Sequence, residues 1–430
     1  MRQLAMLTRR LTGSPDTLVG LRSFSRHGRA YLAAVLSLSL ALLMSACGSR
    51  TAGPGAVASP SASATASPSP SVGVNAAQLI AGSTGWVLSE EALSITSDGG
   101  QTWMSITPPQ VPATAIRGVY FMDTQHGWVV SSSASDQSQL EISVTTDGGS
   151  SWSTSPLGSP EPVFADSTSL PAYVDFVDAQ HGWVVAMIAT SANFSTGILL
   201  QTSDAGATWQ QLRMPVGGPV EFVNPTNGWL ASSGQQGTSD KFYVTSNGGQ
   251  SWTSETVTPP AGFTEAQATY TIPAYTSPAN VVLAAFDNGT DSTAGFYQTG
   301  DNGASWQLKA TVPAGSPAGD VSPSTAIVSD THWLVVSNRG TSITGVTQNG
   351  SSQSTISPIG LPSESGIGDA SFTSSGIGWV VTDTSQCAQS KTGCSETTAL
   401  YGTTDSGAHW TQLPISPGPA PTASATPGAS

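Results

Sequence analysis

TTDGGSSW, at Thr145–Trp152, is one copy of an octet that recurs along the chain. The octet reads Thr-x-Asp-x-Gly-x-x-Trp, and its copies begin at residues 96, 145, 202, 245, 299, 347 and 403. The copies therefore stand roughly 40–60 residues apart, which is about the length of four short strands with their turns. Self-similarity at such a period is the signature of a repeat architecture.

The octet has the composition of a tight turn between two strands. Its Asp carboxylate can accept hydrogen bonds from backbone N–H groups of the turn, and its fifth-position Gly supplies a positive φ without steric cost. We expect the Trp to cover the turn and to pack into the sheet. The expected structural positions are Asp98, Trp103, Asp147, Trp152, Asp204, Trp209, Asn247, Trp252, Asp301, Trp306, Asn349, Asp405 and Trp410. The copy at Asn349 is degenerate, because Ser354 replaces its Trp.

A second repeat, a Gly-Trp pair followed by apolar residues, precedes most octets. It occurs at Gly85-Trp86, Gly127-Trp128, Gly182-Trp183, Gly228-Trp229 and Gly378-Trp379, with His332-Trp333 as a variant and Val281-Val282-Leu283 in the remaining slot. Each unit then consists of strand A, a turn, strand B at the Gly-Trp, a variable loop, strand C, the octet turn and strand D. All 12 Trp fall in the octets or the B strands, so we assign them to the architecture rather than to a ligand cage.

Seven such units predict an all-β fold, a seven-bladed β-propeller of four-stranded antiparallel blades. The propeller is expected over residues 74–415, which leaves about 49 residues for each blade. No second domain is needed to account for the chain.

The octets resemble Asp-boxes, also called bacterial neuraminidase repeats. These occur in sialidases, other glycan hydrolases, sortilin-type receptors and photosystem II assembly-factor propellers. Phe121-Met-Asp123-Thr-Gln-His-Gly127-Trp128 and Phe176-Val-Asp178-Ala-Gln-His-Gly182-Trp183 resemble the assembly-factor family most closely. The resemblance covers about residues 74–415 and implies that the octets lie on the face opposite the usual ligand face. It does not imply one particular activity.

Residues 1–46 are expected to form a lipoprotein signal peptide. Arg22, Arg26 and Arg29 precede an uncharged stretch that ends Leu43-Met44-Ser45-Ala46-Cys47, which resembles a bacterial lipobox. We expect cleavage before Cys47 and lipid attachment to its sulfur, with an uncleaved membrane anchor as the alternative. The protein would then be extracytoplasmic and anchored to the bacterial cell membrane, in the outer leaflet or the outer membrane.

Low-complexity segments flank the expected propeller. Residues 47–73 are predicted to form a disordered tether after the lipidated Cys, and residues 416–430 a disordered tail, because Ser, Ala, Thr, Pro and Gly bury little apolar surface. From Cys47 onward the chain has 7 basic and 26 acidic residues, a net charge of about −19. Such a body is not expected to bind nucleic acid by neutralising phosphates. We expect a monomer without a cofactor.

Cys387 and Cys394 lie in the long B–C loop of the last unit. Outside the cytoplasm, two nearby Cys on one loop are expected to form a disulfide. A metal site would need further ligands. His126 and His181 stand in equivalent A–B turns of different units, so we predict a turn role for them rather than metal binding.

A sialidase is the first enzyme hypothesis, because that chemistry resembles a site with three Arg, a Tyr nucleophile, its Glu partner and an Asp acid/base. The available Arg are Arg117, Arg213 and Arg339, but Leu212-Arg213-Met214-Pro215 follows the third octet, where the similar sialidase motif precedes the first. Other glycoside hydrolases need only two carboxylates. The candidates are Asp166, Glu221, Glu255, Glu265, Asp287, Asp291, Asp320 and Glu364, and their spacing selects no pair.

The B–C and D–A loops share one end of a propeller and are the expected binding surface. The long ones are Ser131–Gln139, Met187–Gly197, Ser232–Asp240, Asp287–Gly295, Thr382–Thr398, Pro156–Leu170 and Thr258–Gln267. This surface is polar, with Phe194, Phe263 and Tyr275 as occasional aromatic residues. We expect a non-catalytic lipoprotein that binds or scaffolds a protein or glycan there, resembling the photosystem II assembly-factor-like proteins. An exo-sialidase or another glycoside hydrolase of extracellular glycans is the alternative.

Overall fold

The structure is a computed structural model, and it describes most of the expected propeller. The described residues are 72–135, 139–158, 170–191, 194–232, 242–276, 279–287, 292–315, 324–329, 332–336, 342–347, 353–362, 366–373, 376–387 and 394–418. The expected signal peptide, Cys47, nearly all of the tether and the chain beyond Gly418 lie outside them. Across the described segments, no helix is both long and apolar enough to cross a membrane.

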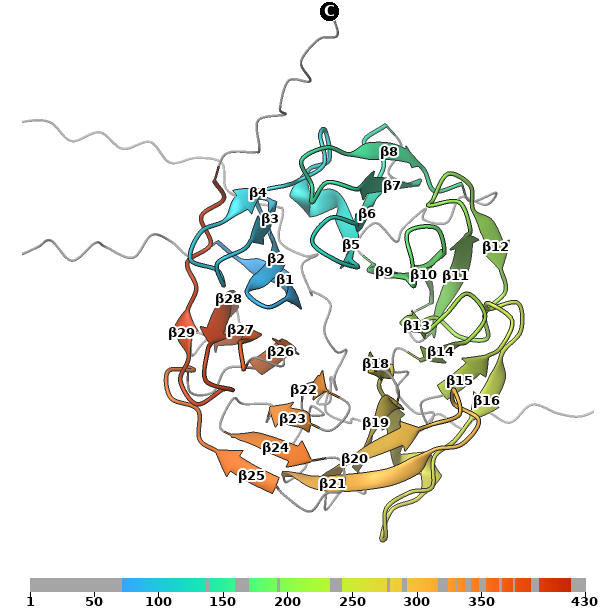
Figure 1. The fold of residues 1–430 in the computed structure, drawn as a ribbon, viewed down its shortest axis with the longest axis vertical. Coiled ribbons are helices and arrows are strands. Elements are labelled where there is room, and N and C mark those ends of the chain that lie inside the picture. The colour runs from blue at the N-terminus through green and yellow to red at the C-terminus, as the bar shows by residue number, and fades with distance from the viewer. Residues whose placement is uncertain are drawn as a thin grey trace, which may run out of the picture.

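The described strands form seven antiparallel sheets, which we call blades 1–7 in chain order. Figure 1 shows the blades arranged radially, with blade 1 beside blade 7. Consecutive strands pair within each blade except at the start of the fifth, and strand A lies innermost and strand D outermost. The all-β propeller architecture predicted from the octets is therefore confirmed.

Six blades have the expected four strands. Blades 1 and 2 comprise β1 (Val74–Ala81), β2 (Thr84–Ser89), β3 (Leu93–Thr96), β4 (Met104–Ser105), and β5 (Ile116–Phe121), β6 (Gly127–Ser132), β7 (Leu140–Thr145), β8 (Ser153–Pro156). Blades 3 and 4 comprise β9 (Ala172–Phe176), β10 (Gly182–Ser191), β11 (Phe194–Thr202), β12 (Gln210–Leu212), and β13 (Val220–Phe222), β14 (Gly228–Ala231), β15 (Phe242–Thr245), β16 (Thr253–Glu255). Blades 6 and 7 comprise β22 (Ser324–Ser329), β23 (His332–Val336), β24 (Ile343–Thr347), β25 (Gln353–Ile356), and β26 (Gly366–Phe372), β27 (Gly378–Cys387), β28 (Cys394–Thr403), β29 (Thr411–Gln412).

Blade 5 departs from the prediction, since it has five strands. They are β17 (Ala268–Tyr270), β18 (Ala274–Thr276), β19 (Ala279–Asp287), β20 (Ser292–Thr299) and β21 (Gln307–Gly315), and both β17 and β18 pair with β19. Strand A is thus split into two pieces, which meet β19 at Tyr270↔Ala284 and Ala274↔Val281. Pro273 stands directly before the second piece and has no N–H for the ladder, which explains the interruption. The expectation of seven four-stranded blades is therefore wrong for this blade and holds for six sheets.

The two ends of the propeller follow from the order of the strands. The A–B turns and the octet turns, which join strands C and D, lie at one end, which we call the octet end. The B–C and D–A connections lie at the other, which we call the loop end. Two D–A connections contain short 3-10 helices, η1 (Ala113–Ala115) and η2 (Glu265–Gln267).

Aromatic stacks between neighbouring blades form much of the core. Trp128 of β6 stacks on Phe176 of β9 with ring centroids 3.8 Å apart, and Trp183 of β10 stacks on Phe222 of β13 at 3.5 Å. The Phe also contacts the octet Trp of its own blade edge-on, as in Phe176–Trp209, whose ring planes lie at 89°. Trp128 and Trp183 are fully buried. The predicted architectural role of the Trp residues is confirmed at these positions.

Candidate functional site

Each octet Asp side chain accepts hydrogen bonds from other residues of the same turn. In blade 2, the Thr145 hydroxyl and the Ser151 N–H both donate to Asp147 Oδ1, at 2.8 Å each. The Ser151 hydroxyl donates to Asp147 Oδ2 at 2.6 Å, and the Gly149 N–H donates to Thr145 Oγ1 at 2.8 Å. The same contacts recur at Asp98, Asp204, Asp301 and Asp405, with His409 in place of the hydroxyl donor in the last copy. Both carboxylate oxygens therefore accept hydrogen bonds that stabilise the turn.

These donors lower the pKa of the octet carboxyls. The pKa of Asp98 falls to about 2, chiefly because the Thr102 hydroxyl donates to it. The pKa of Asp405 also falls to about 2, and the backbone N–H of His409 is the largest cause. A carboxyl this acidic is almost wholly ionised at neutral pH and makes a poor general acid.

Blade 4 shows how Asn replaces Asp in the octet. The Ser251 N–H donates to Asn247 Oδ1 at 2.9 Å, as it would to a carboxylate. Asn247 Nδ2–H then donates to Ser251 Oγ at 2.8 Å, which reverses the direction of the second bond. The turn is kept without a negative charge. The degenerate copy at Asn349 lies outside the described residues.

Two consecutive octet residues adopt positive φ, where the sequence predicts one. The fifth-position Gly of each described octet has φ between 89° and 95°. The fourth position is also left-handed, and it is occupied by a non-Gly residue in three copies: Ala205 (62°), Asn302 (56°) and Ser406 (60°). Left-handed backbone costs such residues roughly 1–2 kcal/mol each, so the network around Asp must impose it.

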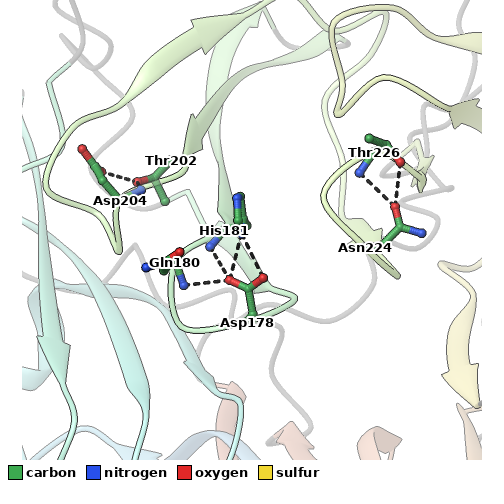
Figure 2. Close-up of polar contacts among 7 residues, drawn as sticks. All are labelled: Asp178, Gln180, His181, Thr202, Asp204, Asn224 and Thr226. Carbon is green, nitrogen blue, oxygen red and sulfur yellow. Dashed lines mark hydrogen bonds and ion pairs between the residues drawn. The ribbon is translucent and has the colours of Figure 1, made fainter.

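The A–B turn of blade 3 binds an acidic side chain in a similar way (Figure 2). The N–H groups of Gln180 and His181 donate to Asp178 Oδ1 at 2.8 and 2.7 Å, and His181 Nδ1 lies 2.9 Å from Asp178 Oδ2. Asp123 and His126 repeat this arrangement in blade 2. The turn role expected for the two His residues is confirmed.

Blade 4 forms the same A–B turn with an amide in place of the carboxylate. Asn224 Oδ1 accepts the N–H groups of Thr226 and Asn227, both at 2.9 Å. Figure 2 shows this turn next to that of blade 3. The turn therefore needs an oxygen acceptor, and it needs neither the charge nor the His.

Hydrogen bonds also join the A–B turn to the octet turn of the same blade. The Gly148 N–H donates to Gln125 O at 2.9 Å in blade 2, and the Ala205 N–H donates to Gln180 O at 3.0 Å in blade 3. Within the described segments, no group of three or more His, Cys, Asp or Glu side chains is placed to hold a metal ion. The polar groups at the octet end thus form a structural network.

A second set of polar side chains joins the innermost strands of neighbouring blades. The Tyr120 hydroxyl, on β5, donates to Phe176 O on β9 at 2.9 Å. Asp175, on β9, accepts the Phe222 N–H of β13 at 2.6 Å. Strand A is a sheet edge, so its inward-facing backbone groups have no ladder partner, and these side chains supply one. We call these contacts inner clasps.

Burial dominates the electrostatics of the inner clasps. Asp175 is only 4% exposed. Its desolvation raises its pKa to about 7, although the N–H groups of Phe222 and Phe176 act in the opposite direction. Desolvation also raises the pKa of Tyr120 far above its usual value, and the nearby charges of Asp175 and Glu221 add to this effect.

The sialidase hypothesis requires a Tyr, an Asp and a Glu, and the inner strands carry Tyr120, Asp175 and Glu221. The environment of these residues does not suit that chemistry. A Tyr nucleophile has to lose its proton, whereas burial and two carboxyls oppose the ionisation of Tyr120. Its hydroxyl also donates to a backbone carbonyl. Sequence reasoning did not single out Tyr120 or Asp175. The available signal was their shared position, directly before the Phe that ends strand A.

The candidate Arg residues are dispersed. Arg117 lies on β5, the innermost strand of blade 2, and its Nη1 donates to Thr114 O at 2.7 Å and to Ile116 O at 3.1 Å. Arg213 directly follows β12, the outermost strand of blade 3. Arg339 lies outside the described residues. The structure thus does not bring Arg117 and Arg213 together as a carboxylate clamp.

The candidate carboxylates are only partly described. Glu265 is exposed on η2, and Glu255 is half-buried at the end of β16, with its pKa raised by burial. Only the backbone of Asp287 is described. Asp166, Asp291, Asp320 and Glu364 lie outside the described residues. The structure therefore selects no catalytic pair among them.

The loop end is described best between β16 and β17. There Gln267 Oε1 accepts the backbone N–H of Thr264 at 2.8 Å and the Thr264 hydroxyl at 3.0 Å, which caps η2. Phe263 packs on Phe286 at a centroid distance of 5.8 Å and so belongs to the core. The side chains of Phe194 and Tyr275, and parts of the other long loops, lie outside the described residues.

The last B–C hairpin places the two Cys of the predicted disulfide opposite each other. Cys387 and Cys394 form the final residue pair of the β27–β28 ladder. Their side chains lie outside the described residues, so the disulfide stays a prediction.

Comparison with protein families finds a match to part of the chain. The family described as "Photosynthesis system II assembly factor YCF48" matches residues 103–269. The matched segment runs from the end of the first octet to the start of blade 5 and includes blades 2–4. No curated protein matches the chain.

Solved structures with a similar fold include two YCF48 proteins. "YCF48 bound to D1 peptide" is 19% identical, covering 70% of this chain and 83% of that one, with a TM-score of 0.42. YCF48 from Cyanidioschyzon merolae is 16% identical, covering 70% and 86%, with a TM-score of 0.44. The GH74 xyloglucanase from Xanthomonas campestris is 15% identical, covering 69% and 45%, with a TM-score of 0.43.

The repeated octets, the radial blades and the family match over blades 2–4 agree with one another. The chain is a β-propeller of the bacterial neuraminidase repeat type, similar to the YCF48 family of assembly factors.

Proposed function

We propose that this protein is a non-catalytic, lipid-anchored propeller that works outside the cytoplasm and binds a protein or glycan partner at its loop end. One observation carries the proposal. The carboxylates of the described octets accept hydrogen bonds from their own turns, and the A–B turns use Asp123 and Asp178 in the same way. These groups are thus committed to the fold, which leaves recognition to the connections at the other end.

The family match supports a binding role rather than catalysis. The matched family is described as an assembly factor, and an assembly factor acts by contact with its client. In this chain the Tyr and Asp that could suggest hydrolysis form inner clasps instead.

Photo-crosslinking in intact cells tests where the partner binds. A photoreactive amino acid at Ala266, which is exposed on η2 at the loop end, is compared with the same amino acid at Gln101, which is exposed in the first octet. We expect a defined crosslinked product from position 266 and none from position 101. A product from position 101 alone, or from neither position, contradicts the proposed binding face.

Membrane anchoring has its own test, because it depends on Cys47. In cells that express the full chain, Cys47→Ser is expected to move the protein from the membrane fraction to the soluble fraction, since a lipid chain anchors through its buried CH₂ groups. Wild type and Ser49→Ala, which leaves Cys47 in place, should stay with the membrane. If Cys47→Ser also stays there after a carbonate wash, the lipid anchor is wrong.

The glycoside hydrolase alternative is tested with the purified full chain. We expect no turnover of fluorogenic sialosides, galactosides or glucosides above that of a buffer control. Turnover that Asp175→Asn abolishes while the protein stays folded would establish catalysis and refute the non-catalytic proposal.

A further inference from the structure

The junction between blades 1 and 7 is unlike the others in one respect. Every other pair of neighbouring blades is joined by continuous chain, whereas these two come from opposite ends of the propeller sequence. Among the described strands, no sheet combines strands from both ends, since β1–β4 form blade 1 and β26–β29 form blade 7. We call this junction the seam (Figure 1). Because the chain does not run directly from one of these blades to the other, non-covalent contacts must close the junction.

Two side-chain contacts join β1, the innermost strand of blade 1, to blade 7. The Leu79 N–H of β1 donates to Ser371 Oγ of β26 at 3.1 Å. Ser371 stands directly before Phe372, the same position that Asp175 and Tyr120 hold in their blades. The Val74 N–H donates to Thr398 Oγ1 of β28 at 2.7 Å. The inner clasp of blades 2–4 thus recurs where the ring closes.

The outer edge of the seam is bridged by the segment after β29. The Gly418 N–H donates to Trp103 O at 3.0 Å, and the Ser105 N–H donates to Gly418 O at 3.4 Å. These two bonds make a parallel bridge between Gly418 and Met104 of β4. Leu413 and Ile415 of the same segment are buried in one cluster with Trp103 and Trp379.

An ordinary blade connection makes the same kind of contact. Between blades 6 and 7, Ile359 follows β25 and forms a parallel bridge with His409, just before β29. The Ile359 N–H donates to Ala408 O at 2.9 Å, and the Trp410 N–H donates to Ile359 O at 2.8 Å. Gly418 therefore bridges the outer edge of blade 1 as Ile359 bridges that of blade 7, although Met104 follows its octet Trp and His409 precedes its own.

We propose that Leu413–Gly418 is a strap that holds the ring closed, and that the ring opens at the seam when the strap detaches. Leu413 and Ile415 anchor the strap to the core, and Gly418 completes it through two backbone bonds to blade 1. Residues of the seam should therefore open together and more often than those between continuous blades. The segment expected to be disordered from residue 416 starts with three residues that belong to this strap.

Gly418→Ala tests the strap with one methyl group. A Cβ at Gly418 would lie 2.6 Å from Trp103 O, a backbone atom that cannot move away cheaply. Gly300→Ala is the matched control, because a Cβ there meets nothing within 4 Å and neither backbone has a positive φ. Hydrogen–deuterium exchange of the full chain is the readout. We expect Gly418→Ala to speed exchange of β1 and β26 roughly tenfold, with blades 3 and 4 unchanged, since two bonds of modest strength are lost.

Two truncations keep the test decisive if Gly418→Ala should prevent folding. A chain that ends at Gly418 retains the strap, and a chain that ends at Ile415 retains the apolar anchors without the two backbone bonds. The first should exchange like wild type, and the second should show faster exchange confined to the seam. Equal exchange in both chains, or an increase spread evenly over all blades, overturns the proposal.

Discussion

The octet end and the loop end of this propeller differ in how far their sequence is fixed by the fold. At the octet end, five described Asp residues make the same bonds to their turns, and Asn247 substitutes by reversing one bond. At the loop end, the connections differ in length, and within the described residues 3-10 helices occur in two of them. The repeated residues maintain the scaffold, whereas the connections are free to differ, and so they can carry recognition.

The largest expected effect is a difference in stability loss between a substitution in the scaffold and one at the loop end. Trp183→Ala should lower the free energy of unfolding by about 3–5 kcal/mol, because it removes a fully buried ring that stacks on Phe222 and leaves a cavity. Glu265→Ala, at an exposed loop-end position, should change it by less than about 0.5 kcal/mol. Urea denaturation measures both. Similar losses in the two variants would remove the distinction between the ends.

Two substitutions of Asp147 should show whether the octet needs its hydrogen-bond acceptor or its negative charge, with a smaller loss of stability than that of Trp183→Ala. Asp147→Ala leaves the Ser151 N–H and two hydroxyls without their acceptor and should cost about 1–2 kcal/mol. Asp147→Asn should cost clearly less, since Asn247 forms the same turn in blade 4. Thermal unfolding of the two variants decides the matter. Equal losses would mean that the octet depends on the charge.

The two kinds of carboxyl should affect stability with opposite pH dependence. The folded pKa of Asp405 is lowered, so its contribution is present above about pH 4 and is lost as the pH falls through about 2. The folded pKa of Asp175 is raised, so its contribution is complete below about pH 4 and is lost as the pH rises through about 7.

Asp175→Asn isolates the second of these contributions. Asn keeps an oxygen acceptor for the Phe222 N–H and does not ionise. Melting temperatures between pH 4 and 8 should fall in wild type relative to Asp175→Asn as the pH rises. A difference that stays constant over this range would contradict the raised pKa of the buried carboxyl.

The smallest expected effect concerns the fourth octet position. Ala205 adopts φ = 62°, a conformation that Gly adopts without strain. Ala205→Gly should therefore raise the free energy of unfolding by at most about 1 kcal/mol, less the entropy that Gly loses on folding. The octet Ser150→Gly serves as a control, because Ser150 does not have positive φ. Destabilisation by Ala205→Gly larger than that by Ser150→Gly would show that the turn is unstrained.

The sequence predicted the parts of this protein that repeat. Thr-x-Asp-x-Gly-x-x-Trp located the described octet turns, and the Gly-Trp pairs located most of the B strands, because local turn chemistry and aromatic packing recur in most copies. The split strand A of blade 5 was missed, because the effect of Pro273, which occurs in this copy alone among the described A strands, was not considered. The inner clasps were missed as well, because Tyr120, Asp175 and Ser371 share a position and a task but no chemical type.

Closure of the ring could not be predicted from the repeat. Strands that meet at the seam are more than 290 residues apart, as in the bond between Leu79 and Ser371. Gly418 lies in a stretch whose composition suggests disorder, and only the position of Trp103 beside it reveals a structural role. The loop end was equally beyond prediction, because a connection that occurs once has no second copy with which to compare it.

The central claim is that the octet end serves stability and the loop end serves binding. The most direct test is the crosslinking yield from position 266 in intact cells, measured in Asp147→Ala and in Glu265→Lys at a temperature where both are folded. We predict that Asp147→Ala lowers the melting temperature and keeps the crosslink, whereas Glu265→Lys keeps the melting temperature and weakens the crosslink. A crosslink lost in Asp147→Ala and unchanged in Glu265→Lys would contradict the account.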